Sequence, residues 1–159
     1  RAAVGPDYPI ILRWSQWKQQ DYTARLAVTP EELTRFLMPL SDAGVDIFHC
    51  SQRRFWEPEF EGSELNLAGW TKQITGKPAI TVGSVGLDAE FTPKPGEEHF
   101  REAEPASIDT LLARLEQDEF DLVAVGRAMI ANPDWVNLVE AKRMQSLKPF
   151  RKEHLGQLI

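Results

Sequence analysis

Cysteine is almost absent from this sequence of 159 residues, in which Cys50 stands alone. A lone cysteine excludes a disulfide within the chain and fits a reducing compartment, so we expect a cytoplasmic protein. No apolar run approaches the roughly 20 residues that a membrane span needs. Acidic residues outnumber basic ones by 24 to 18, a net charge of −6, which argues against a nucleic-acid or anionic-membrane surface. We therefore expect neither of these as a partner, and we predict no metal site.

An initiator methionine is lacking as well. The chain begins Arg1-Ala2-Ala3, and a strand-like apolar run has already started by Ile10. The length suits one domain, residues 1–159. We interpret the sequence as a fragment of a longer protein.

Four apolar runs divide the chain, starting near residues 10, 46, 79 and 121. One amphipathic helix pattern lies between each pair of runs, for example the capping box that starts at Thr29. After the fourth run, Asn132-Pro133-Asp134 predicts another helix start. Alternation of this kind predicts an α/β fold with four βα units and parallel strands. Four units make the C-terminal half of a TIM (β/α)8 barrel, for which a full chain takes about 250 residues; the alternative is a small, open, doubly wound sheet.

Polar residues or glycines stand at the end of every predicted strand. They are Arg13, His49 with Ser51, Gly83 with Ser84, and Gly126 with Arg127. Ligands of α/β folds bind at these carboxyl ends. The glycine turns would expose backbone N–H groups to an anion, and Arg127 would add a permanent cation.

The other polar residues have plainer interpretations. Taken by itself, Arg13 favours a structural ion pair with an acid on a neighbouring strand. We expect His49 to be a packing residue with a hydrogen bond, and Cys50 to be a small buried hydrophobic residue rather than a nucleophile. Phe55 and Trp56, in an Arg-rich loop, could line a substrate pocket or cover the barrel end. Residues 87–106 read as a long irregular insertion, and residues 148–159 as a basic tail.

The sequence resembles the C-terminal half of the old yellow enzyme family, FMN-dependent ene-reductases on an eight-stranded barrel. The similarity extends to members like 12-oxophytodienoate reductase and NADH:flavin oxidoreductase. The segments that carry it, in the family's order, are ILRWS (Ile11–Ser15), AGVDIFHCS (Ala43–Ser51), PAITVGSVG (Pro78–Gly86) and DLVAVGRAMIANPDW (Asp121–Trp135). The last segment is the most specific.

The resemblance implies roles for individual residues. Arg13 matches the arginine beside the flavin N1–C2=O edge, where a cation stabilises the reduced flavin. Gly83 and Ser84 match the turn whose N–H groups meet the FMN phosphate, and Gly126 and Arg127 match the pair that closes this phosphate site. Phe55 and Trp56 fall, by a loose match, in a loop that borders the substrate.

The resemblance also implies an activity, reduction of activated C=C bonds in α,β-unsaturated carbonyls with NAD(P)H as reductant. The family's catalytic residues belong to the N-terminal half-barrel, so we expect the chain to need that half as a partner and to be inactive alone. Two alternatives stay open: a phosphate-binding barrel enzyme without flavin, and a non-catalytic half-barrel that forms homo-oligomers through its sheet edges.

Overall fold

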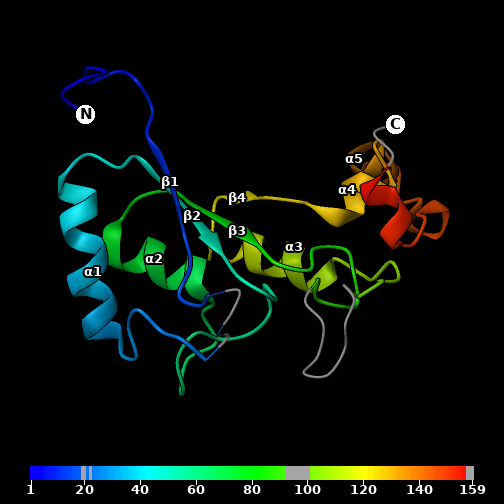
Figure 1. Ribbon diagram of the computed structural model, residues 1–159, viewed down its shortest axis with the longest axis horizontal. Helices are drawn as coiled ribbons and strands as arrows, with labels where there is room; N and C mark the ends of the chain where they lie inside the picture. Colours follow the sequence, from blue (N-terminus) through cyan, green and yellow to red (C-terminus); the bar gives the residue numbers. More distant parts are fainter. Residues whose placement is uncertain (19–20, 22, 92–100, 157–159) are drawn as a thin grey trace.

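The computed structural model describes residues 1–18, 21, 23–91 and 101–156. Its central feature is a four-stranded sheet in the order β1-β2-β3-β4, in which all neighbouring strands are parallel. Helices connect successive strands, so the predicted α/β architecture of four βα units is confirmed (Figure 1).

The strands and helices lie close to their predicted positions. They are β1 (Ile11–Trp14), α1 (Pro30–Asp42), β2 (Ile47–Ser51), α2 (Leu67–Thr75), β3 (Ala79–Val82), α3 (Asp109–Glu116), β4 (Leu122–Val123), α4 (Arg127–Ala131), α5 (Trp135–Glu140), η1 (Met144–Ser146) and η2 (Lys152–Leu155). Figure 1 shows α4, α5 and the C-terminal segment gathered together at the end of the molecule opposite the N-terminus.

The start of α1 shows why local sequence predicts these elements well. The Thr29 side chain accepts a hydrogen bond from the Glu32 N–H, and Pro30 occupies the first helical turn. Both features satisfy or remove backbone donors that a helix start leaves unpaired. The Thr29 cap and Pro30 therefore fix where the helix begins, while the Glu32 side chain accepts from Val28 N rather than from Thr29 N.

The helix predicted to start at Asn132-Pro133-Asp134 is present as α5, but it begins at Trp135 and Asn132 is not its cap. Helix α4 begins directly after Gly126 and ends before Asn132, and α5 begins at Trp135. The Asn132 side chain is instead a buried tertiary link, because it donates to Ala128 O and Lys148 O and accepts from Lys148 N. An asparagine that caps a helix and one that ties two segments together look alike in sequence.

The register places side chains on two faces of the sheet. Arg13, His49, Ile80 and Leu122 stand in one row across the four strands. This row and its neighbours form the open face, where Leu122 is 50% exposed and Ile11 is 54% exposed. The opposite, covered face packs against the helices.

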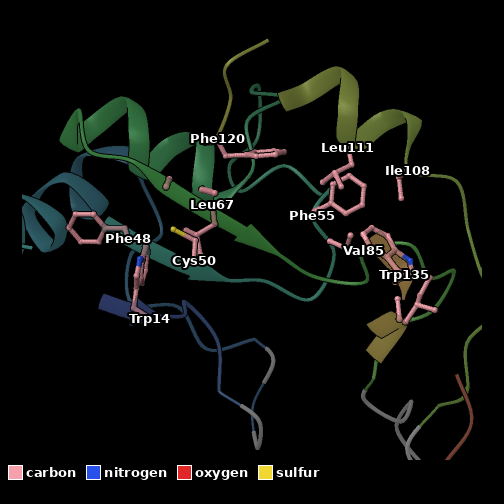
Figure 2. Close-up of a cluster of buried hydrophobic side chains, with 14 of the residues drawn as sticks. Trp14, Phe48, Cys50, Phe55, Leu67, Val85, Ile108, Leu111, Phe120 and Trp135 are labelled. Atoms are coloured by element: carbon pink, nitrogen blue, oxygen red, sulfur yellow. The ribbon is translucent and has the colours of Figure 1, made fainter. Parts of the chain in front are cut away.

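The covered face holds the hydrophobic core. Phe48 and Cys50 of β2 are buried with Trp14 of β1, and α2 packs over β2 and β3. Figure 2 shows this cluster beside Leu67 and Phe120, with a second group around Phe55, Leu111, Val85 and Trp135 toward α4. Burial raises the pKa of the Cys50 thiol to about 12, which confirms Cys50 as a buried hydrophobe rather than a nucleophile.

The predicted irregular insertion contains a paired stem, which we call the strap: residues 87–91 and 101–105. Leu87 pairs with Pro105 in an antiparallel bridge, and Arg101 N donates to Phe91 O. Residues 92–100, the centre of the predicted insertion, lie outside the described residues.

The strap also holds the C-terminal segment, which is not the unpatterned tail that the sequence suggested. Ala103 and Phe150 exchange two backbone hydrogen bonds, at 3.1 and 2.8 Å. Phe150 is only 1% exposed. Its burial depends on residues almost fifty positions earlier, a contact that no local pattern signals.

Candidate functional site

An open pocket of about 440 Å³ lies at the carboxyl ends of β3 and β4. Its lining includes all five residues predicted to bind a cofactor, namely Arg13, Gly83, Ser84, Gly126 and Arg127. Small-molecule sites of proteins typically measure about 300–1,000 Å³. The structure therefore brings together, in one pocket of suitable size, residues from three strands.

The Gly83–Ser84 turn is tightly constrained. Gly83 has a φ of +136°, and a Cβ there would lie 2.8 Å from the Gln52 carbonyl oxygen. Only glycine fits such a position without strain. Ser84 also has a positive φ, of 50°, and its Oγ lies 3.1 Å from Arg53 O and 3.2 Å from Ala89 O. Three segments thus fix the shape of the turn.

Gly126 leaves space where a side chain would otherwise stand. No atom lies within 4 Å of the position that a Cβ would occupy. The glycine follows β4, which ends at Val123, and leads directly into α4, whose first residue is Arg127. The absent side chain allows a ligand to approach the backbone beside that arginine.

Arg127 is a half-buried cation with no ion-pair partner among the described residues. Its Nη2 donates to the Ala89 carbonyl at 2.6 Å, while Nη1 has no hydrogen-bond partner among the described residues. Within the same described residues, no carboxylate lies within ion-pair distance, and burial lowers its pKa from the ordinary value. A desolvated cation of this kind is stabilised by an anion.

Arg13 extends from the open face toward the same pocket. Its Nη2 lies 3.4 Å from Ser51 Oγ, a long contact, and the side chain is exposed. The structural ion pair considered for Arg13 does not form with any carboxylate in the described part of the chain. The guanidinium is therefore available to a ligand.

His49 stands next to Arg13 in the register. Partial burial, and secondarily the charge of Arg13, lower the pKa of His49 from 6.5. Its Nε2 is buried and has no hydrogen-bond partner within the described residues. The expected packing is therefore present, but the expected hydrogen bond at Nε2 is not. A neutral imidazole is the form that these surroundings favour.

Three charged residues beside the pocket were not predicted from the sequence. Glu90 of the strap forms ion pairs with Arg53 at 2.8 Å and with Arg54 at 3.1 Å. Both arginines belong to the loop after β2, so these ion pairs connect two loops beside the pocket. The two neighbouring arginines were visible in the sequence, but nothing in the sequence indicated that their partner is Glu90, in a distant insertion.

The aromatic pair proposed to line the substrate pocket lies elsewhere. Phe55 is 3% exposed and packs in the core, with its ring edge-on to Trp56 at 5.1 Å. Phe55 N donates to Gly83 O, and the Arg114 guanidinium donates to Trp56 O. Neither aromatic residue lines the pocket. The pair supports the Gly83 turn from behind, because this loop folds back under the end of β3.

Two kinds of feature are missing from the described residues. Within those ranges, no group of three or more His, Cys, Asp or Glu side chains could hold a metal ion. None of the helices described is long and apolar enough to cross a membrane.

The chain was compared with known protein families, sequences and solved structures. No protein-family model matches the chain. A protein named NADH oxidase from Thermoanaerobacter brockii is 30% identical over 164 residues, a match that covers 98% of this chain and 22% of that protein. Among solved structures, morphinone reductase in complex with tetrahydroNAD superposes with a TM-score of 0.57 at 15% identity, covering 91% of this chain and 31% of that one.

A second solved structure gives a similar match. The old yellow enzyme homologue from Zymomonas mobilis gives a TM-score of 0.56 at 15% identity, over 91% of this chain and 34% of that one. The predicted resemblance to the old yellow enzyme family is confirmed. The fold is a four-βα-unit part of a TIM barrel, and the chain spans only 22% of the length of the curated relative that it matches.

Proposed function

We propose that this chain forms part of the FMN site of an NAD(P)H-dependent oxidoreductase in the cytoplasm. The enzyme would reduce activated C=C bonds of α,β-unsaturated carbonyls. The observation that carries the proposal is the single pocket lined by Arg13, the Gly83–Ser84 turn and the Gly126–Arg127 corner. An oxidoreductase role also agrees with the names of the relatives, an NADH oxidase and a morphinone reductase.

The residues present fit a phosphorylated, electron-accepting cofactor. In the lining of the pocket, the Nη1 of Arg127 is buried and has no hydrogen-bond partner among the described residues, and Gly126 carries no side chain that would cover the backbone. A phosphate dianion would satisfy both the charge and the donors. Arg13 supplies a second cation for a group elsewhere in the same pocket. A phosphate alone would leave Arg13 without a function, which favours a ligand with two acceptor regions, such as FMN.

When bound, FMN would supply hydride transfer between NAD(P)H and the alkene. The contribution of this chain is binding and electrostatics. Backbone N–H groups of the Gly83–Ser84 turn and the Arg127 guanidinium would hold the phosphate. The Arg13 guanidinium, unpaired with any acid in the described residues, would stabilise negative charge that accumulates on the flavin edge.

The open face of the sheet suggests how the site is completed. Parallel sheets are normally covered on both faces, yet Ile11 and Leu122 are large apolar residues left exposed here. We propose that further βα units of the same longer protein cover this face and supply the groups that bind the enone. The 159 residues alone would then bind FMN weakly and would not catalyse.

The test uses the natural protein that contains this chain. It should be yellow, its flavin spectrum should bleach when NADPH or NADH is added, and 2-cyclohexenone should restore the colour. Arg13→Gln should slow bleaching and reoxidation while FMN stays bound. Leu112→Gln, on the exposed side of α3 away from the pocket, is the matched control.

A colourless protein that binds inorganic phosphate at Arg127 would contradict the proposal. That result would favour the second candidate, a barrel enzyme that binds a phosphorylated substrate without flavin. A colourless protein that binds neither would reject both candidates.

A further inference from the structure

Arg127 is enclosed by groups from two distant segments. Its guanidinium carbon lies 5.6 Å from the centre of the Phe91 ring and 5.5 Å from the centre of the Phe150 ring. The Ala89 carbonyl holds Nη2. The strap thus contributes one ring and one acceptor, and the C-terminal segment contributes the other ring.

The two segments are themselves joined. Phe150 exchanges backbone hydrogen bonds with Ala103 on the far strand of the strap, and Arg151 forms an ion pair with Glu104. On the near strand, Glu90 is tied to Arg53 and Arg54. The two segments that carry the rings are therefore held in place by contacts that do not involve Arg127.

A cation in contact with two aromatic rings keeps few rotamers. A guanidinium within about 6 Å of a ring centre gains roughly 0.5–2 kcal/mol, most when it is desolvated. An arginine that is already ordered before its ligand arrives loses less entropy when the ligand binds. One carbonyl occupies Nη2, and Nη1 is buried without a hydrogen-bond partner among the described residues, so Nη1 is the donor that a bound anion would satisfy.

We propose that Phe91 and Phe150 are positioning residues that orient Arg127 for a phosphate monoester. This inference deepens the proposed function and rests on it. It assigns a task to the strap and to the C-terminal segment, two regions in which the sequence indicated no site. It also predicts a selectivity: the two rings strengthen binding of a ligand only when that ligand carries the phosphate.

The experiment compares FMN with riboflavin, which has the same ring system and no phosphate. Dissociation constants for both are measured by fluorescence quenching on the natural protein that contains this chain. Arg127→Gln should abolish the preference for FMN. Phe91→Leu should reduce it about threefold to thirtyfold by removing the ring while keeping an apolar side chain. Phe91→Tyr, which retains a ring, should restore it.

Phe150 needs a second measurement, because it is part of the core. Phe150→Leu should reduce the same preference, and in an Arg127→Gln background neither Phe91→Leu nor Phe150→Leu should reduce it further. Phe60→Leu is the control, since Phe60 is also half-buried and packs against Trp70, with ring centres 5.4 Å apart, away from the pocket. It should lower the melting temperature without changing the preference.

The outcomes separate this inference from the proposed function. If the unaltered chain does not prefer FMN over riboflavin, the phosphate site and the positioning role both fail. If Arg127→Gln removes the preference but Phe91→Leu and Phe150→Leu keep it, only the positioning role is overturned. Equal losses in Phe91→Leu and Phe60→Leu, or in Phe91→Leu and Phe91→Tyr, would also overturn it, because the effect would not depend on the ring beside Arg127.

Discussion

The two faces of the sheet differ more than any other pair of regions in this molecule. The covered face is a hydrophobic core in which even the thiol of Cys50 is fully buried. The open face carries a cation, an imidazole and exposed aliphatic side chains. Because strand residues alternate between faces, adjacent positions in the sequence have opposite tasks: one stabilises the fold and the next is available for chemistry.

The largest expected effect concerns two neighbouring residues of β2. Cys50, with its pKa raised to about 12, should react with a thiol reagent at pH 8 about a thousandfold more slowly in the folded chain than in urea, since only the thiolate reacts. In a Cys50→Ala background, the thiol of Ser51→Cys should react within about tenfold of the unfolded rate. Equal rates at the two positions would contradict the assignment of faces.

The second comparison uses the same substitution on both faces. Leu67→Ala, at 1% exposure under the covered face, should cost about 2–5 kcal/mol of the free energy of unfolding. Leu122→Ala, at 50% exposure on the open face, should cost less than about 1 kcal/mol. Urea denaturation of the chain measures both. A large loss at Leu122 would mean that the open face is already packed.

The third comparison concerns the glycines at the two strand ends. Gly83→Ala should cost about 1–3 kcal/mol, because its φ is positive and its Cβ would meet the backbone of residues 52–54. Gly126→Ala should cost less, since its Cβ would enter open space. Its methyl group should instead weaken FMN binding. Thermal melting with and without FMN distinguishes the two, and the reverse order would contradict the placement of the pocket.

The smallest expected effect is a pH dependence on the open face. Because the pKa of His49 is lowered in the folded state, the unfolded state binds its proton more readily. The free energy of unfolding should therefore fall as pH drops from about 7 through 6.5 to the lowered pKa of the folded state, and this contribution should level off below that pKa. Arg13→Gln should reduce that fall by removing a nearby positive charge. An NMR titration that finds His49 at or above 6.5 would contradict this prediction.

Local patterns were sufficient to predict the sheet. The cap at Thr29, the apolar runs of the strands and the glycines after them depend only on residues near in sequence, and the resemblance added the proposed role of Arg13. The surroundings of Arg127 were not predictable, because Ala89, Phe91 and Phe150 come from an irregular insertion and an apparent tail. Asn132 misled for the same reason: its partner is Lys148, outside any local motif.

The central claim is that the ends of β3 and β4 together hold one phosphate while Arg13 faces the rest of the ligand. A crystal structure of the natural protein that contains this chain, with FMN bound, tests this most directly. The account predicts the phosphate between the Gly83–Ser84 turn and the Arg127 Nη1 edge, with the flavin ring beside Arg13. A phosphate bound elsewhere, or a flavin ring far from Arg13, would contradict it.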